Sequence, residues 1–138
     1  MRSEIVFFDT AYQSKKGFFR GVAALGALLS LSYLWYGVVA SDVYSPHIDG
    51  GIPKNRPLIS TIVLSLLISS AIAVQLPKYA ATAILYGALM GLVIYGCMNA
   101  GILMVHAKWS PGIALLDTMW GVCSSSAVAF LVYKIFFI

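Results

Sequence analysis

The chain has 138 residues, of which 60% are hydrophobic and 10% are charged, and its mean hydropathy is +0.88. Soluble domains carry about 25% charged residues and disordered segments need low hydrophobicity, so both classes are excluded, and two cysteines are too few for a disulfide scaffold. The formal net charge of +4 fits anionic lipid headgroups better than nucleic acid, so we expect the lipid bilayer as surroundings and no nucleic acid as a partner.

Four long apolar runs follow one another along the chain, and each approaches the roughly 20 residues that a membrane-spanning helix needs. We expect helices over about 21-40, 58-76, 79-105 and 113-133. Ser41–Pro57 contains three prolines and a diglycine, a composition that predicts the loop after the first helix. Pro77-Lys78 predicts a tight turn between the second and third helices, and 106–112 predicts a short connection before the fourth. The predicted fold is therefore all-α, an integral membrane bundle of four transmembrane helices with short loops.

The predicted organisation has two parts, an N-terminal surface arm over 1-16 and a four-helix transmembrane domain over 17-138. The arm combines the apolar run Ile5-Val6-Phe7-Phe8 with charged residues. Such a segment can lie on lipid headgroups or bind another protein. We expect a protein partner to bind this arm together with the loop 41-57.

The basic residues predict the orientation of the bundle. With four spans, the side that holds both termini carries six lysines and arginines, and the other side carries three. The six are Arg2, Lys15, Lys16, Arg20, Lys78 and Lys134, and the three are Lys54, Arg56 and Lys108. Because cytoplasmic segments carry the excess of positive charge, we expect a multi-pass protein with both termini cytoplasmic.

Small residues recur every four positions in the third and fourth predicted helices, where they permit close helix packing. Gly87 and Gly91 form a GxxxG step, and Gly121, Ser125 and Ala129 repeat the spacing. Gly26 with Ser30 and Ser65 with Ser69 extend the pattern to the first two helices. We expect packing within one bundle, and a homo-oligomer interface is the alternative.

Polar residues at membrane depth form the candidate site. Asn99 lies about 9 Å, and Asp117 about 6 Å, from the connection between the last two helices, so we expect the two side chains to hydrogen-bond. Ser32 and Tyr36 approach the same side from the first helix. The favoured interpretation is a polar clamp that fixes helix register. The alternative is a site for a cation, a proton or a small polar ligand, because an acid inside a membrane is by default a candidate site.

The remaining chemistry-bearing residues do not predict catalysis. Cys97 and Cys123, which we expect to be packed as free thiols in the last two helices, lack any CxxC or His-Cys spacing for a metal. No nucleophile has a base beside it, and a lipid-modifying enzyme would have only His106 and Asp117 to use. We therefore expect no enzyme, metal or cofactor. Three further aromatic residues are expected in the interfacial belt, namely Tyr44, Tyr79 and Trp109.

Several short stretches together resemble a known family. They are Leu31-Ser32-Tyr33-Leu34-Trp35-Tyr36-Gly37, Tyr44, Tyr95, Asn99, Trp109-Ser110-Pro111 and Asp117-Thr118-Met119-Trp120-Gly121. This pattern, over roughly residues 25 to 130, is similar to that of uncharacterised small four-helix membrane proteins of bacteria, with relatives encoded by large DNA viruses. The resemblance implies a fold and no settled activity. Bacterial members tend to have acids at the positions of Ser32 and Gly96. If the acids of the family form a path for protons or cations, this chain keeps only Asp117 and Asn99 of it, which favours a transporter less.

We therefore expect a structural or assembly protein of a membrane. The resemblance makes the internal membrane of a large DNA virus particle one place for such a role, with both termini on the face equivalent to the cytoplasm. The alternative is a small transporter or channel with a polar site at Asp117 and Asn99. Four short helices enclose little volume, so such a transporter would need to oligomerise.

Overall fold

The computed structural model describes the backbone of residues 2–47 and 56–138, and the side chains of residues 14–47 and 61–138. These residues are helical almost throughout and include no strand, so the all-α prediction is confirmed. The elements are α1 (Arg2–Leu34), η1 (Trp35–Val39), α2 (Ser41–Tyr44), η2 (Ser45–His47), α3 (Arg56–Val74), α4 (Ala80–Val105) and α5 (Pro111–Phe137). The expected loop after the first helix thus contains two short helical turns before residue 48, and its centre lies outside the described residues.

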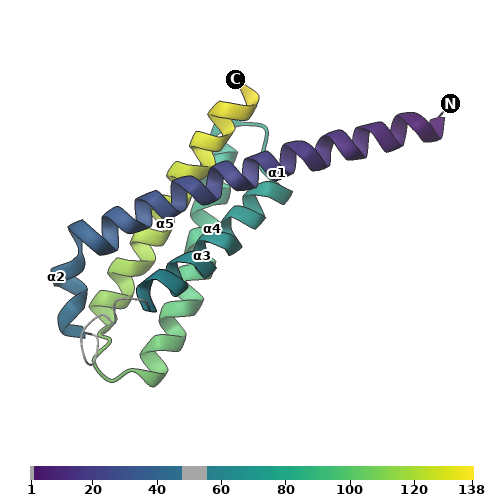
Figure 1. Ribbon diagram of the computed structural model, residues 1–138. Coiled ribbons are helices and arrows are strands. Elements are labelled where there is room, and N and C mark those ends of the chain that lie inside the picture. The colour runs from purple at the N-terminus through teal and green to yellow at the C-terminus, as the bar shows by residue number, and fades with distance from the viewer. Residues whose placement is uncertain (1, 48–55) are drawn as a thin grey trace.

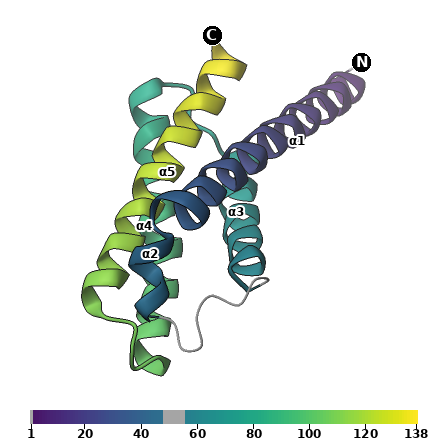
Figure 2. The ribbon, with the colours of Figure 1, turned by 60° about the vertical axis from the view of Figure 1, so that its left-hand side comes forward.

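The long helices form two pairs. Helices α4 and α5 make an antiparallel hairpin, and α1 packs on α3 and crosses α5 (Figure 1). Both ends of the chain lie toward the same end of the bundle, and the first part of α1 projects sideways from it (Figures 1 and 2). The end that holds the α4–α5 connection also holds α2.

Three helices are long and apolar enough to cross a membrane, at Ser14–Val39, Ala80–Val105 and Pro111–Phe137. The expected fourth span is not confirmed. Its helix, α3, has 19 residues, and the apolar stretch within the described side chains, Thr61–Val74, is about 21 Å long. The first residues of α3, 56–60, lie outside the side chains that the structure describes.

Helix α1 runs through the expected boundary between arm and bundle. It has 33 residues and no break near residue 16, which gives it a length of about 50 Å. Its length therefore exceeds the thickness of the hydrocarbon core. The projecting part is a continuation of the first span in the same helix.

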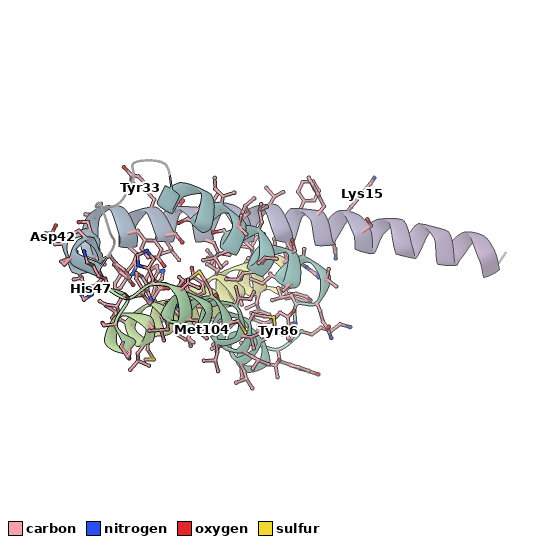
Figure 3. The ribbon with its side chains drawn as sticks, turned by 90° about the horizontal axis from the view of Figure 1, so that it is seen from below. Lys15, Tyr33, Asp42, His47, Tyr86 and Met104 are labelled. Atoms are coloured by element: carbon pink, nitrogen blue, oxygen red, sulfur yellow. The ribbon has the colours of Figure 1, made fainter. Side chains whose placement is uncertain are left out.

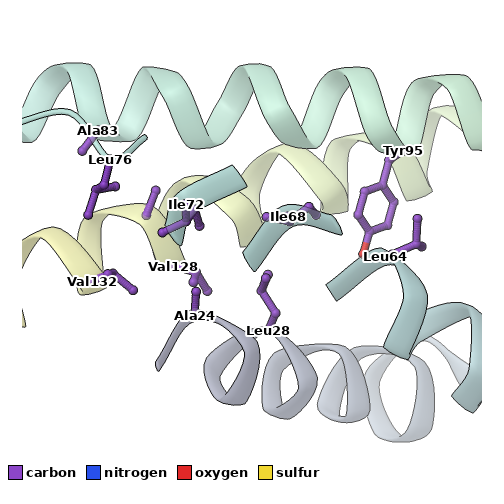
Figure 4. Close-up of a cluster of buried hydrophobic side chains, with 11 residues drawn as sticks. Ala24, Leu28, Leu64, Ile68, Ile72, Leu76, Ala83, Tyr95, Val128 and Val132 are labelled. Atoms are coloured by element: carbon purple, nitrogen blue, oxygen red, sulfur yellow. The ribbon is translucent and has the colours of Figure 1, made fainter. Parts of the chain in front are cut away.

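The apolar core lies where the two helix pairs meet, and Figure 4 shows its side chains between the four helices. Leu28 of α1, Ile68 and Ile72 of α3, and Val128 and Val132 of α5 are at most 1% exposed. Outside this core the large apolar side chains face outward, among them Leu85, Met104 and Leu115. In a membrane protein these outer residues contact lipid.

The α4–α5 hairpin is held close by glycine. A methyl group at Gly91 would collide with the backbone of Gly121 and Val122, and one at Gly87 would collide with Ser125 and Ala129. Helix α5 contributes the fully buried Ser125, and a methyl group at Gly121 would overlap the ring of Tyr95. The GxxxG faces are therefore filled within one chain.

Two details differ from the expected packing. Gly26 faces open space, whereas Gly17 and Gly21 approach Ala73 of α3 and provide the close contact of α1. Cys97 and Cys123 are free but exposed, so their expected burial is wrong. Both thiols lie on the outer side of the hairpin, because the glycine face of each helix is the one that packs inward.

Candidate functional site

Asp117 is the centre of the candidate site and is 1% exposed. Helix α5 starts at Pro111, where the hydroxyl of Ser110 accepts a hydrogen bond from the backbone N–H of Ile113 at 3.3 Å. Serine before proline is a strong helix start. The helix begins two residues before the expected position, so Asp117 lies about 9 Å inside it, at the same depth as Asn99 in α4.

The carboxylate of Asp117 accepts three side-chain hydrogen bonds. The phenol of Tyr36 donates to Oδ1 at 2.6 Å, and the phenol of Tyr44 donates to the same oxygen at 3.0 Å. The amide of Asn99 donates to Oδ2 at 2.8 Å. The bond expected between Asn99 and Asp117 is therefore present, and the three donors come from η1, α2 and α4. One buried side chain thus connects four elements of the fold.

Asn99 makes several further hydrogen bonds within the cluster. Its Nδ2 also donates to the backbone oxygen of Tyr95 at 3.0 Å, and its Oδ1 accepts a bond from Nε1 of Trp109 at 2.9 Å. A longer contact of 3.4 Å joins Nδ2 to the hydroxyl of Thr118. Both ends of this amide are therefore occupied, which fixes the orientation of the side chain.

A change in helical winding brings the aromatic donors inward. At η1 the α-helix widens into a π turn, closed by a hydrogen bond of 2.8 Å from the Ala40 N–H to the Trp35 carbonyl. Such turns shift the side chains that follow and are frequent at functional sites. Trp35 stacks on Trp120 with a centroid distance of 4.5 Å and an interplanar angle of 3°, and its Nε1 donates to the Tyr44 hydroxyl at 3.3 Å.

Tyr44 lies just beyond the first candidate span and closes the cluster from α2. It is 2% exposed, so its expected place in the interfacial belt is wrong. Burial and the neighbouring Asp117 carboxylate raise the pKa of Tyr44 well above its ordinary value. The phenol therefore keeps its proton and acts as a donor. Tyr79, by contrast, is well exposed.

Ser32 is buried at the same end of α1. Of the three residues expected beside Asp117, Tyr36 and Asn99 bond it directly and Ser32 does not. It lies beside Tyr95, which also interacts with Tyr36. Trp109, assigned by sequence to the interfacial belt, instead bonds Asn99. The sequence places Tyr44 and Trp109 in predicted polar loops, and only their occurrence in the same resemblance as Asp117 indicated a shared site.

The side chains that bond the carboxylate of Asp117 are all uncharged donors. The donors to Asp117 are two phenols and one amide, so the described side chains provide no basic partner for the carboxylate. Among the described residues no group of three His, Cys, Asp or Glu residues could hold a metal. A carboxylate has about four lone-pair positions, of which three are used here.

A family model with the description "Predicted membrane protein (DUF2177)" matches residues 18–134. No curated protein and no solved structure matches the chain. The matched range contains the whole polar cluster and all four long helices apart from the first part of α1 and the last residues of α5. The projecting part of α1 is thus outside the family's region.

Proposed function

Because the chain belongs to the DUF2177 family of predicted membrane proteins, we propose that it is a multi-pass structural or assembly protein whose bundle anchors a partner or a larger complex. The observation that carries this proposal is the Asp117 cluster. Its hydrogen bonds connect η1, α2, α4 and α5 through side chains that are mostly buried. Because the polar groups of this site already bond one another, the site is better suited to holding helices together than to passing a solute.

The close packing of the bundle supports a structural role. Association of helices in lipid depends on close packing and interhelical hydrogen bonds. This chain has both, since the α4–α5 hairpin approaches at Gly87 and Gly91 and the polar cluster ties that hairpin to η1 and α2. Such a bundle maintains a fixed geometry at its surface, which suits an anchor.

The projecting part of α1 is the proposed attachment point, together with the segment 41-57. It extends from the bundle in Figures 1 and 2, it lies outside the matched family region, and its sequence combines Ile5-Val6-Phe7-Phe8 with charged residues. A helix that continues from a membrane span holds a partner at a defined distance from the bundle. Within this proposal both termini face the cytoplasm or, in the internal membrane of a large DNA virus particle, the equivalent face.

The proposal is tested by removing residues 1–14. We expect the truncated protein to insert and fold, because this part of α1 projects away from the other helices (Figures 1 and 2), and to lose its recovery with the larger complex. Replacing Leu85 with Ala, an exposed position on α4, is the control and should leave recovery unchanged. Full co-purification of the truncated protein with the complex would refute the anchoring role.

A small transporter or channel at Asp117 and Asn99 is the second candidate. The observation in its favour is that the described part of the chain gives the buried carboxylate no basic partner, and acids inside membranes often mark proton or ion paths. In liposomes, a transporter would produce a proton or cation flux that Asp117→Asn abolishes and Ser126→Ala leaves intact. The structural proposal predicts no flux above that of protein-free liposomes.

A further inference from the structure

Arg20 occupies an unusual position where α1 crosses α5. Its guanidinium carbon lies 4.7 Å from the centroid of the Phe137 ring, a distance typical of a cation–π contact. Its Nε is buried and has no hydrogen-bond partner among the described residues. A buried donor without an acceptor is costly, but Nε is covered by the protein, so it is not the atom that a ligand would reach. Arg20 as a whole is only half-buried, which leaves other atoms of its side chain open to an acceptor.

The height of Arg20 relative to the bilayer follows from the same contact. Phe137 is the last residue of the α5 candidate span, so the guanidinium lies level with the end of that span. Lipid phosphates lie just outside the hydrocarbon core, and we place them at this end of α5, although Arg20 itself falls within the candidate span Ser14–Val39 of α1. Arginine matches phosphate oxygens with a planar fork of donors.

Charge at this end of the molecule is mainly basic, and the sequence also places two acids, Glu4 and Asp9, in the first part of α1. The cations of this end are Lys15, Lys16, Arg20, Lys78 and Lys134. The two acids among the described side chains, Asp42 and Asp117, lie toward the other end of the bundle, and Figure 3 shows Lys15 and Asp42 far apart along the molecule. This distribution selects an anionic ligand.

Apolar surface lies directly next to these charges. Phe130, Tyr133 and Phe137 form a row on α5, with centroid distances of 6.5 Å and 5.6 Å between neighbours. All three rings are half-buried. On α1, Phe18 and Phe19 are 68% and 58% exposed. A ligand that matches both the cations and this surface has a phosphate joined to long hydrocarbon chains.

We propose that the crossing of α1 and α5 binds one anionic phospholipid, with the Arg20 guanidinium as the ligand of its phosphate and the Phe130–Tyr133–Phe137 row as the surface for an acyl chain. The surrounding lysines favour a headgroup with net negative charge. This inference requires only the membrane environment and is independent of the assembly role, since neither residues 1–14, whose removal tests that role, nor the Asp117 cluster takes part in it.

The test measures lipid binding to the full chain in detergent, by native mass spectrometry and by the shift in thermal unfolding midpoint. Phosphatidylglycerol should bind and stabilise the protein more than phosphatidylcholine does, and inorganic phosphate alone should have no effect. Because hydrogen bonds to a charged group are strong, Arg20→Gln should weaken phosphatidylglycerol binding about tenfold or more. Lys15→Gln removes an exposed charge from the same helix and should weaken binding much less.

Three results would overturn the assignment. They are unchanged phosphatidylglycerol binding in Arg20→Gln, an equal loss in Lys15→Gln, and equal effects of phosphatidylcholine or free phosphate. If Arg20→Gln does not fold, Arg20→Lys replaces it, because lysine keeps the charge and lacks the planar fork. We expect this variant to bind more weakly than the unaltered protein, and equal affinity would contradict the assigned phosphate contact.

Discussion

Replacing Gly91 with alanine should destabilise the protein, because no space exists for the added methyl group. The atoms that it would meet belong to the backbone of Gly121 and Val122, and backbone cannot rotate away as a side chain can. Helices α4 and α5 must therefore move apart. Overpacking of this kind costs about 1–3 kcal/mol, and we take the upper end because the obstructing atoms are rigid.

Part of this cost is offset by the helix itself. Alanine is favoured over glycine in a helix interior by about 1 kcal/mol. The net prediction for Gly91→Ala is a loss of about 2 kcal/mol in the free energy of unfolding. Gly101, in the same helix, has nothing within 4 Å of an added methyl group, so Gly101→Ala is the matched control and should stabilise by up to about 1 kcal/mol.

The assay is reversible unfolding in mixed detergent micelles, followed by tryptophan fluorescence. The two variants should change stability in opposite directions. Equal stability of Gly91→Ala and Gly101→Ala would refute the close packing of the α4–α5 hairpin.

Two further predictions concern the polar cluster and the topology. Tyr44→Phe removes one donor to Asp117 and should lower the unfolding free energy by about 0.6 kcal/mol, the average for such bonds in a membrane. The control is Ser30→Ala, because the hydroxyl of Ser30 bonds Gly26 in its own helix. This variant should have little effect in the same assay. In a cysteine-free background, single cysteines at positions 54 and 78 should react with a membrane-impermeant reagent from opposite faces of the membrane, and labelling from one face would contradict the four-span topology.

Much of the helical framework follows from hydropathy alone. The expected third helix ends at Val105, as α4 does, and the fourth expected helix, 113-133, lies within α5. Apolar runs bounded by proline and charge are sufficient for such predictions, because lipid requires every backbone polar group to bond within its own helix. The glycine spacing likewise placed Gly87 and Gly91 on the face that packs against α5.

Hydropathy could not predict how far the first helix extends or where its winding changes. The segment before Lys15 is polar enough to resemble a surface arm, yet α1 is continuous through it. The π turn at Trp35–Val39 depends on the tertiary contacts of Trp35 and Tyr36, which no local propensity encodes. The bond from Tyr44 to Asp117 could not be predicted for the same reason, because only the fold brings α2 next to Asp117.

The central claim is that the buried polar cluster holds the helices together, and a double-mutant cycle between Asn99 and Asp117 tests it most directly. Unfolding free energies of Asn99→Ala, Asp117→Ala and the double variant give the coupling between the two side chains. Their bond of 2.8 Å predicts a favourable coupling of about 0.6–1.7 kcal/mol. The matched cycle of Asp117→Ala with Ser126→Ala, whose hydroxyl bonds Val122 in its own helix, should give none. A coupling between Asn99 and Asp117 that is no larger than in this control cycle would contradict the clamp.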